Sequence, residues 1–150
     1  MTPLETYGFM IALAGHSRLH RTWNVIKLER LFWPPVSLGQ IFIGTDRAHP
    51  WFATWALLSE DAETRWLAGR KLQPGDWQSG ERVWIVDAIC PMGGVRDMVR
   101  HIRRELTAKA DAEDWTADRA CWTRLADDLR TTRKRGHVTR ADEPSLHSAS

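Results

Sequence analysis

The sequence predicts one α/β domain in which helices flank a short, mostly antiparallel sheet. Residues 40–57 hold two apolar, strand-like runs on either side of a turn at 46–50, a pattern that predicts a hairpin. Residues 82–90 are apolar on both faces, as expected of a central strand that is covered on both sides. Helical spacing of apolar residues precedes and follows these strands. The 150 residues are the usual size of a single domain with one core.

Two short helices are expected in the N-terminal third. Apolar residues recur at helical spacing over 3–14, and Gly15 can end that helix. A second helix is expected over 25–32, because Pro34 and Pro35 lack the backbone N–H that a helix interior needs.

Three further helices are expected. Ser59 is followed by two acids that suit the first turn of a helix, which should run to about residue 68. Another helix follows the turn at 91–94, with most of its arginines away from its apolar stripe. A last helix is expected over 112–133. The polar stretch 135–150 is expected to be a disordered tail, which leaves 1–134 as the folded domain.

Composition and charge narrow the class of protein. A hydrophobic fraction of 43% excludes wholesale disorder, and nine tryptophans favour a Trp-rich core slightly over an apolar binding surface. The net charge of +2 does not by itself imply nucleic acid. Arginines gather at 96–104 and 130–140, and either an acidic partner or a solvated basic face explains them. The apolar stretch 9–14 is too short for a membrane span, so a cytoplasmic protein is expected.

Asp87 and two histidines are candidates for catalytic chemistry. A carboxylate inside an apolar strand is costly unless it is paired, so Asp87 meets an imidazole or cation, or lies where the strand ends splay and water enters. A buried aspartate that holds an arginine or a loop N–H is the purely structural explanation. His16 and His20 flank Ser17, and imidazole titrates near neutral pH, which suits proton transfer. An ordinary surface histidine explains either residue taken alone.

Gly93, Gly94 and Cys90 carry weaker signals. Glycines between a strand and a helix allow a phosphate, such as that of a phosphopantetheine arm, to reach the free N–H groups of the helix. A plain turn explains them as well. Cys90 could be a nucleophile paired with a histidine, but in an apolar run it is more often a small buried hydrophobe. Cys90 and Cys121 lack the spacing of a disulfide framework or a zinc site.

Several segments in a fixed order resemble the RTX toxin-activating lysine acyltransferases, which act on protoxins of the haemolysin and adenylate-cyclase-toxin type. The match covers about residues 4 to 106. The matching residues are Ser17, His20, Arg21 and Trp23, then Gly39 and Gln40, then Thr54, Trp55 and Ala56, and then Trp77, Ser79, Gly80, Arg82, Trp84, Asp87 and Pro91. Several motifs in order are far more specific than any one of them.

The resemblance implies an acetyltransferase-like (GNAT-like) fold over 1–134 and the transfer of a fatty acyl group from acyl carrier protein to internal lysines of an RTX protoxin. It assigns the catalytic pair to His20 and Asp87, with Ser17 in support. No metal and no cofactor beyond the acyl carrier donor is expected. His20 would take the proton of the lysine amine or carry the acyl group itself. Gly93, Gly94, Arg96 and Arg100 are the expected donor-binding residues.

The chain departs from the family pattern at three places, one of which is the run Cys90-Pro91-Met92-Gly93, where the family has an Ala-Pro-Phe-Gly-like run. Ala88 stands where the family usually has Trp, and one or two strands after residue 106 are expected to be missing. The acyl cleft would then be more open, completed by a homodimer partner, or defective. A catalytically lapsed relative that binds an acyl carrier or a protein is therefore the alternative. A nucleic-acid binder ranks last, because no recognised motif supports it.

Overall fold

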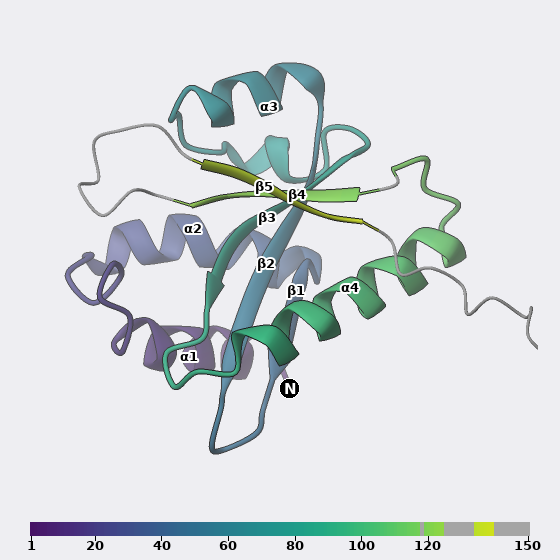
Figure 1. Ribbon diagram of the computed structural model, residues 1–150. Coiled ribbons are helices and arrows are strands. Elements are labelled where there is room, and N and C mark those ends of the chain that lie inside the picture. Colours follow the sequence, from purple (N-terminus) through teal and green to yellow (C-terminus); the bar gives the residue numbers. More distant parts are fainter. Residues whose placement is uncertain (118, 125–133, 140–150) are drawn as a thin grey trace, which may run out of the picture.

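A computed structural model describes residues 1–117, 119–124 and 134–139 of the chain (Figure 1). The elements in these ranges are α1 (Pro3–Ala14), α2 (Val25–Leu38), β1 (Ile41–Gly44), β2 (Trp51–Leu58), α3 (Glu60–Leu67), the 3-10 helix η1 (Pro74–Trp77), β3 (Arg82–Ile89), α4 (Val95–Ala112), β4 (Arg119–Arg124) and β5 (Lys134–Thr139). None of the helices in the described ranges is long and apolar enough to cross a bilayer. The predicted α/β class is confirmed.

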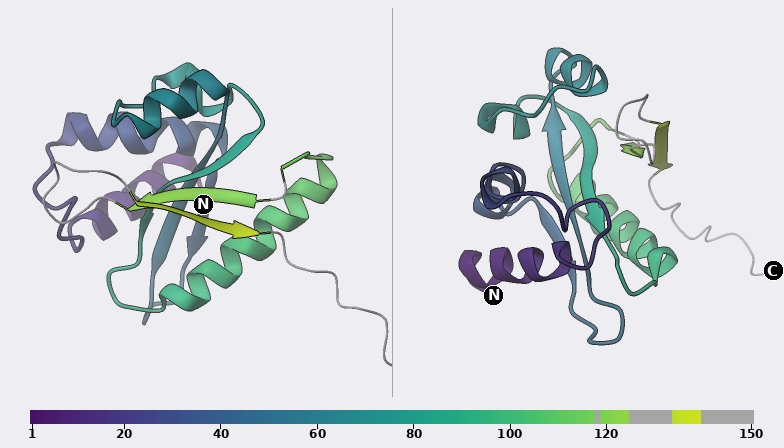
Figure 2. Two further views of the ribbon diagram at one scale, coloured as in Figure 1. Left: turned by 45° about the horizontal axis from the view of Figure 1, so that its top comes forward. Right: turned by 90° about the vertical axis from the view of Figure 1, so that its left-hand side faces the viewer.

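The strands form one sheet in the order β1-β2-β3-β4-β5. Three neighbouring pairs are antiparallel, and only β3 and β4 are parallel, with α4 as the crossover between them. The mostly antiparallel sheet is thus confirmed, and β3 lies at its centre as its apolar sequence predicts. Helices α1 and α2 cover one face of the sheet and α4 the other, while α3 lies at one end (Figure 2).

Hydrophobic clusters on both faces hold the helices to the sheet. Phe32 of α2 packs on Phe52 of β2, and Met98 of α4 belongs to a cluster with Trp51 and Trp55 on the other face. Most tryptophans serve the core: the five that are less than a tenth exposed are Trp51, Trp55, Trp66, Trp77 and Trp84. The interpretation of the Trp content as a core is therefore confirmed for these five residues.

Helix α2 continues six residues beyond its predicted end at Phe32, through both prolines, to Leu38. The expectation that Pro34 and Pro35 end the helix is therefore wrong. Each proline removes one backbone donor and crowds the preceding turn. Burial of Phe32, Pro35 and Val36 against the sheet outweighs that cost, and Gly39 in the left-handed conformation then ends the helix.

The region after α4 forms strands. Residues 119–124 form β4 beside β3, and residues 134–139 form β5 beside β4. The predicted helix over 112–133 is therefore wrong at 119–124, and the expectation of missing strands is wrong as well. Without β4, one edge of the apolar strand β3 would have no partner for its backbone N–H and C=O groups. Residues 135–139 of the predicted tail form a strand. The rest of the predicted tail, 140–150, and the end of the predicted helix, 125–133, lie outside the described ranges.

Gln40 fastens the start of β1 to two other elements. Its side chain is 1% exposed, and its Nε2 donates to the carbonyl oxygens of Trp55 (3.2 Å) and Trp77 (3.0 Å). The backbone N–H of Trp55 donates in return to the carbonyl of Gln40 (3.0 Å). One buried amide thus joins β1, β2 and η1.

We expect Gln40→Ala to lower the free energy of unfolding by about 1–3 kcal/mol, because it removes a donor from two carbonyls and leaves a void. Urea denaturation measures this loss. Gln78→Ala is the matched control, since Gln78 is exposed. Equal unfolding free energies for the two variants would show that the buried amide contributes nothing.

Candidate active site

A β-bulge in β3 sets the direction of Asp87. Thr54 of β2 lies opposite Asp87, but the next residue, Trp55, lies opposite Ile85, so Val86 has no partner. One extra residue reverses the alternation of side chains along a strand. Asp87 therefore shares the face of Ile89, which packs in the α1–α2 cluster, and not the α4 face of Val83.

His20 meets Asp87 from the segment between α1 and α2. Its ring Nε2 lies 2.7 Å from Asp87 Oδ2, and its residue is 3% exposed. The second carboxylate oxygen, Oδ1, accepts the backbone N–H of Ala88 at 2.9 Å. The structure thus brings together the two residues that the sequence predicts as a pair, 67 positions apart in the chain.

Ser17 extends this pair to a chain of three side chains. Its hydroxyl oxygen lies 2.7 Å from His20 Nδ1 and also accepts the His20 backbone N–H at 3.4 Å. Since an ionised carboxylate only accepts, Nε2 carries the ring proton toward Asp87, and Nδ1 of the neutral imidazole accepts from the Ser17 O–H. Ser17 and Asp87 are both half-buried, while His20 between them is buried.

Aromatic rings fix the imidazole plane. The Trp23 ring centroid lies 4.6 Å from that of His20 and the Phe32 centroid 6.1 Å away. The Trp23 backbone N–H also donates to the His20 carbonyl at 2.9 Å, which closes a tight turn between them. Trp23 appears in the sequence motif, but its packing on His20 could not be inferred there, because the segment has no regular period.

Thr54 is a neighbour that the sequence analysis did not single out as a site residue. It is 0% exposed and lies directly opposite Asp87 in the sheet. Its hydroxyl has no hydrogen-bond partner among the described residues. One available signal was a polar residue within the apolar run of β2.

The predicted donor-binding residues lie after β3. Gly93 and Gly94 both have positive φ, and Gly94 is the N-cap of α4. Arg96 and Arg100 are exposed on the first turns of α4, and Arg100 pairs with Asp97 at 2.9 Å. The geometry places a helix N-terminus and two guanidinium groups on one segment, while their binding of a donor stays a prediction.

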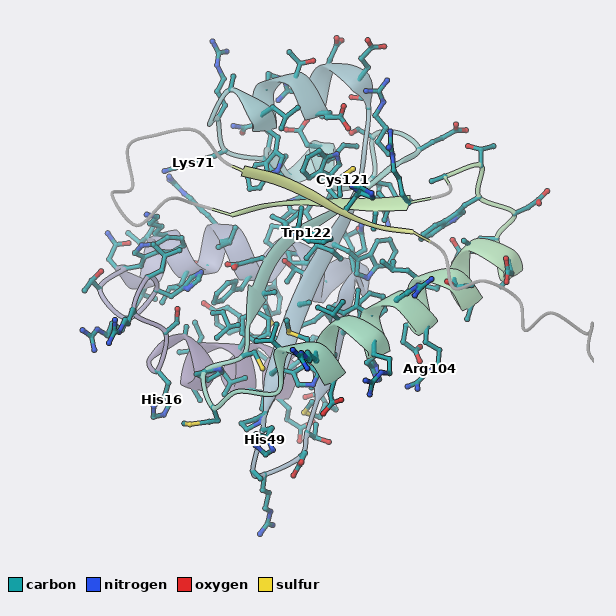
Figure 3. The ribbon with its side chains drawn as sticks, in the orientation of Figure 1. His16, His49, Lys71, Arg104, Cys121 and Trp122 are labelled. Carbon is teal, nitrogen blue, oxygen red and sulfur yellow. The ribbon has the colours of Figure 1, made fainter. Side chains whose placement is uncertain are left out.

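Cys90 does not have the environment of an activated nucleophile. Its thiol donates to the Gly93 carbonyl at 2.9 Å, and burial raises the pKa of the thiol above its usual range. The reactive thiolate is therefore scarcer than in an ordinary cysteine. His16 is exposed at the edge of the molecule (Figure 3). Within the described ranges, no three His, Cys, Asp or Glu residues gather as metal ligands would.

A serine, a histidine and an aspartate linked in this order are the side-chain types of catalytic triads, in which a histidine moves a proton for a neighbouring hydroxyl. Residues 1–133 match the model of the HlyC family, the RTX toxin acyltransferase family, and the chain belongs to this family. The resemblance that the sequence motifs indicate is thereby confirmed, and the mixed sheet is consistent with an acetyltransferase-like fold.

Three relatives illustrate the similarity. The chain is 30% identical over 123 residues to the lysine-acyltransferase RtxC of Vibrio cholerae. The aligned region covers 80% of this chain and 77% of RtxC. It is 31% identical over 105 residues to the protein-lysine myristoyltransferase HlyC of Escherichia coli, with 69% and 62% covered. It is 34% identical over 96 residues to the protein-lysine palmitoyltransferase CyaC of Bordetella bronchiseptica, with 63% and 51% covered. The match thus spans about three quarters of the first relative and less than two thirds of the other two.

Proposed function

We propose that this chain transfers a fatty acyl group from the thioester of acyl carrier protein to lysine side chains of an RTX protoxin, in the cytoplasm. The observation that carries the proposal is the chain of hydrogen bonds from Ser17 through His20 to Asp87. Family membership and the names of the relatives support the reaction class. Acyl carrier protein as the donor is what the resemblance to the family implies, and the helix N-terminus at Gly94 is compatible with it.

His20 is the proposed base. The neutral amine of a lysine attacks the thioester carbonyl, and its nitrogen must give up one proton as the amide bond forms. His20 is buried, and both of its ring nitrogens have hydrogen-bond partners. The proton of the lysine amine therefore reaches Nδ1 by way of the Ser17 hydroxyl. Ser17 passes its own proton to Nδ1 while it takes one from the amine. Asp87 stabilises the imidazolium that forms and keeps the ring in the correct tautomer.

The rest of the step balances without a cofactor. The amine nitrogen forms an amide bond with the acyl carbon as the carbon–sulfur bond breaks. The imidazolium returns its proton to the departing thiolate, which leaves as the free thiol of the carrier. An acyl group on His20 itself is the second route open to this site.

The segment after β3 is the proposed donor site. The free N–H groups at the start of α4, beside Gly93 and Gly94, suit the phosphate of a phosphopantetheine arm. Arg96 and Arg100 add positive charge that suits the acidic surface of a carrier protein. The protoxin and the carrier are thus the proposed partners, and a homodimer is an assembly that the proposal does not require.

The alternative, a catalytically lapsed relative that binds without turnover, has lost the main observation that supported it. It rested on strands thought to be missing after α4, and β4 and β5 occupy that place. We therefore retain it only as an outcome of the test.

The test offers the purified chain a panel of acyl carrier proteins loaded with different acyl chains, together with an RTX protoxin fragment. Carrier binding and transfer are measured separately. The proposal expects both, with transfer lost in His20→Ala while binding survives. Carrier binding without transfer for any acyl chain would favour the lapsed relative instead.

A further inference from the structure

Lys27 differs from the other lysines of the chain in its position. The sequence has four lysines, at 27, 71, 109 and 134. Lys27 lies in the first turn of α2, where its backbone N–H donates to the Asn24 side chain that caps the helix. Its Nζ lies 3.6 Å from the centroid of the Trp23 ring. That ring in turn packs on His20, so this amine and the proposed catalytic imidazole contact the same indole.

The environment of Lys27 favours a reactive amine. Loss of water around the amine lowers the pKa of Lys27, and the positive charge of Lys71 (Figure 3) makes a smaller contribution in the same direction. A lower pKa raises the fraction of neutral amine, which is the form that attacks a carbonyl. The contact with the face of Trp23 holds the charged side chain near the site, and it weakens when the amine becomes neutral.

The surface beside Lys27 also suits an acyl chain. Val25 is 73% exposed and Ile26 is 62% exposed, both on the same first turn of α2. A fatty chain attached to Nζ could cover these apolar side chains and so leave water. Lys109, by comparison, lies on α4, across the sheet from His20, with its Nζ 5.5 Å from the Trp55 ring centroid.

We propose that Lys27 is an acylation site of the chain itself, with an acyl thioester as the donor. The inference rests on the proposed function, because it uses the same base and the same donor. The Lys27 nitrogen forms an amide with the acyl carbon, and the carbon–sulfur bond breaks. The amine proton passes by way of Ser17 and His20 to the thiol that leaves.

The experiment incubates the purified chain with acyl carrier protein loaded with a fatty acyl group, first alone and then, in a parallel reaction, with an RTX protoxin fragment. Peptide mass spectrometry quantifies the acyl group on each lysine of the chain and of the fragment. Lys71 and Lys109 serve as references within the same molecule. Lys27→Arg keeps the positive charge and the contact with Trp23 but cannot form the amide.

We expect acylation of Lys27 to exceed that of Lys71 and Lys109 several-fold, and to fall by about 10²-fold or more in His20→Ala. In Lys27→Arg the acyl group should not move to Lys71 or Lys109. Equal labelling of Lys27, Lys71 and Lys109, or labelling unchanged in His20→Ala, would indicate chemical acylation by the thioester and overturn the inference. An unlabelled Lys27 beside an acylated protoxin fragment would overturn it while leaving the proposed function intact. No transfer to either protein would count against both.

Discussion

Replacing His20 with alanine should lower the rate of acyl transfer by about 10²- to 10⁴-fold, the usual contribution of a general base. His20 Nδ1 faces the Ser17 hydroxyl, and Asp87 holds its Nε2. Another histidine could replace His20 between these two residues only if the chain rearranged. The variant leaves the amine of the acceptor lysine without a base, while the surfaces that bind both substrates are unchanged. Transfer should therefore fall through kcat, with little change in KM.

His16→Ala is the matched control, because His16 lies in the same segment but is exposed. It should keep nearly full activity. Circular dichroism and thermal melting establish that both variants fold, which matters because the imidazole of His20 also packs on Trp23 and Phe32. Equal activities of the two variants would remove His20 from the mechanism.

Replacing Asp87 with asparagine should lower transfer by about 10³- to 10⁴-fold while the fold is preserved. The two side chains have nearly the same shape, but the asparagine amide donates where the carboxylate accepts. It would leave the ring proton on Nδ1 of His20, which then cannot accept from Ser17. The amide also cannot stabilise the imidazolium by charge.

Asp97→Asn is the control for the loss of one carboxylate, because Asp97 is exposed and pairs only with Arg100 among the ion pairs of the described residues. It should leave kcat within about two-fold of the wild type, as a surface ion pair contributes little. The pH profile of kcat provides the second measurement. If Asp87→Asn kept the wild-type rate and profile, the carboxylate would serve the fold and not the reaction.

Local patterns suffice to predict the N-terminal helix, the hairpin and the central strand. Each depends on contacts within a short stretch: helical spacing over 3–14, a turn at 46–50, and an apolar run at 82–90. They agree with α1, the β1–β2 pair and β3. These elements also position the site, but the pairing of His20 with Asp87 follows from the family resemblance and not from these local patterns.

Long-range packing explains the elements that the sequence analysis missed. Trp115 and Trp122 lie seven residues apart, a spacing typical of a helical stripe, yet Trp122 pairs with Ile85 in a strand. The free edge of β3 decides this, and it is not visible in the local sequence. Likewise, α2 continues through Pro34 and Pro35 because its buried face packs against the sheet.

The detail of the site was beyond sequence reasoning for a related reason. The apolar run at 82–90 has no alternation, so nothing in it reveals that Val86 is unpaired or that Asp87 changes face. Thr54 becomes a neighbour of Asp87 only through the register of β2 and β3. The Ser17–His20 contact is closer to the sequence, because a turn of three residues links them.

The most direct test of the account is the mass of the lysines in an RTX protoxin fragment after incubation with this chain and acyl carrier protein loaded with a fatty acyl group. The account predicts an amide-linked acyl group on specific lysines with the wild-type chain. It predicts no more than the background without enzyme when His20→Ala or Asp87→Asn replaces the wild type. Acylation at the wild-type level by both variants, or none by the wild-type chain bound to its carrier, would contradict the central claim.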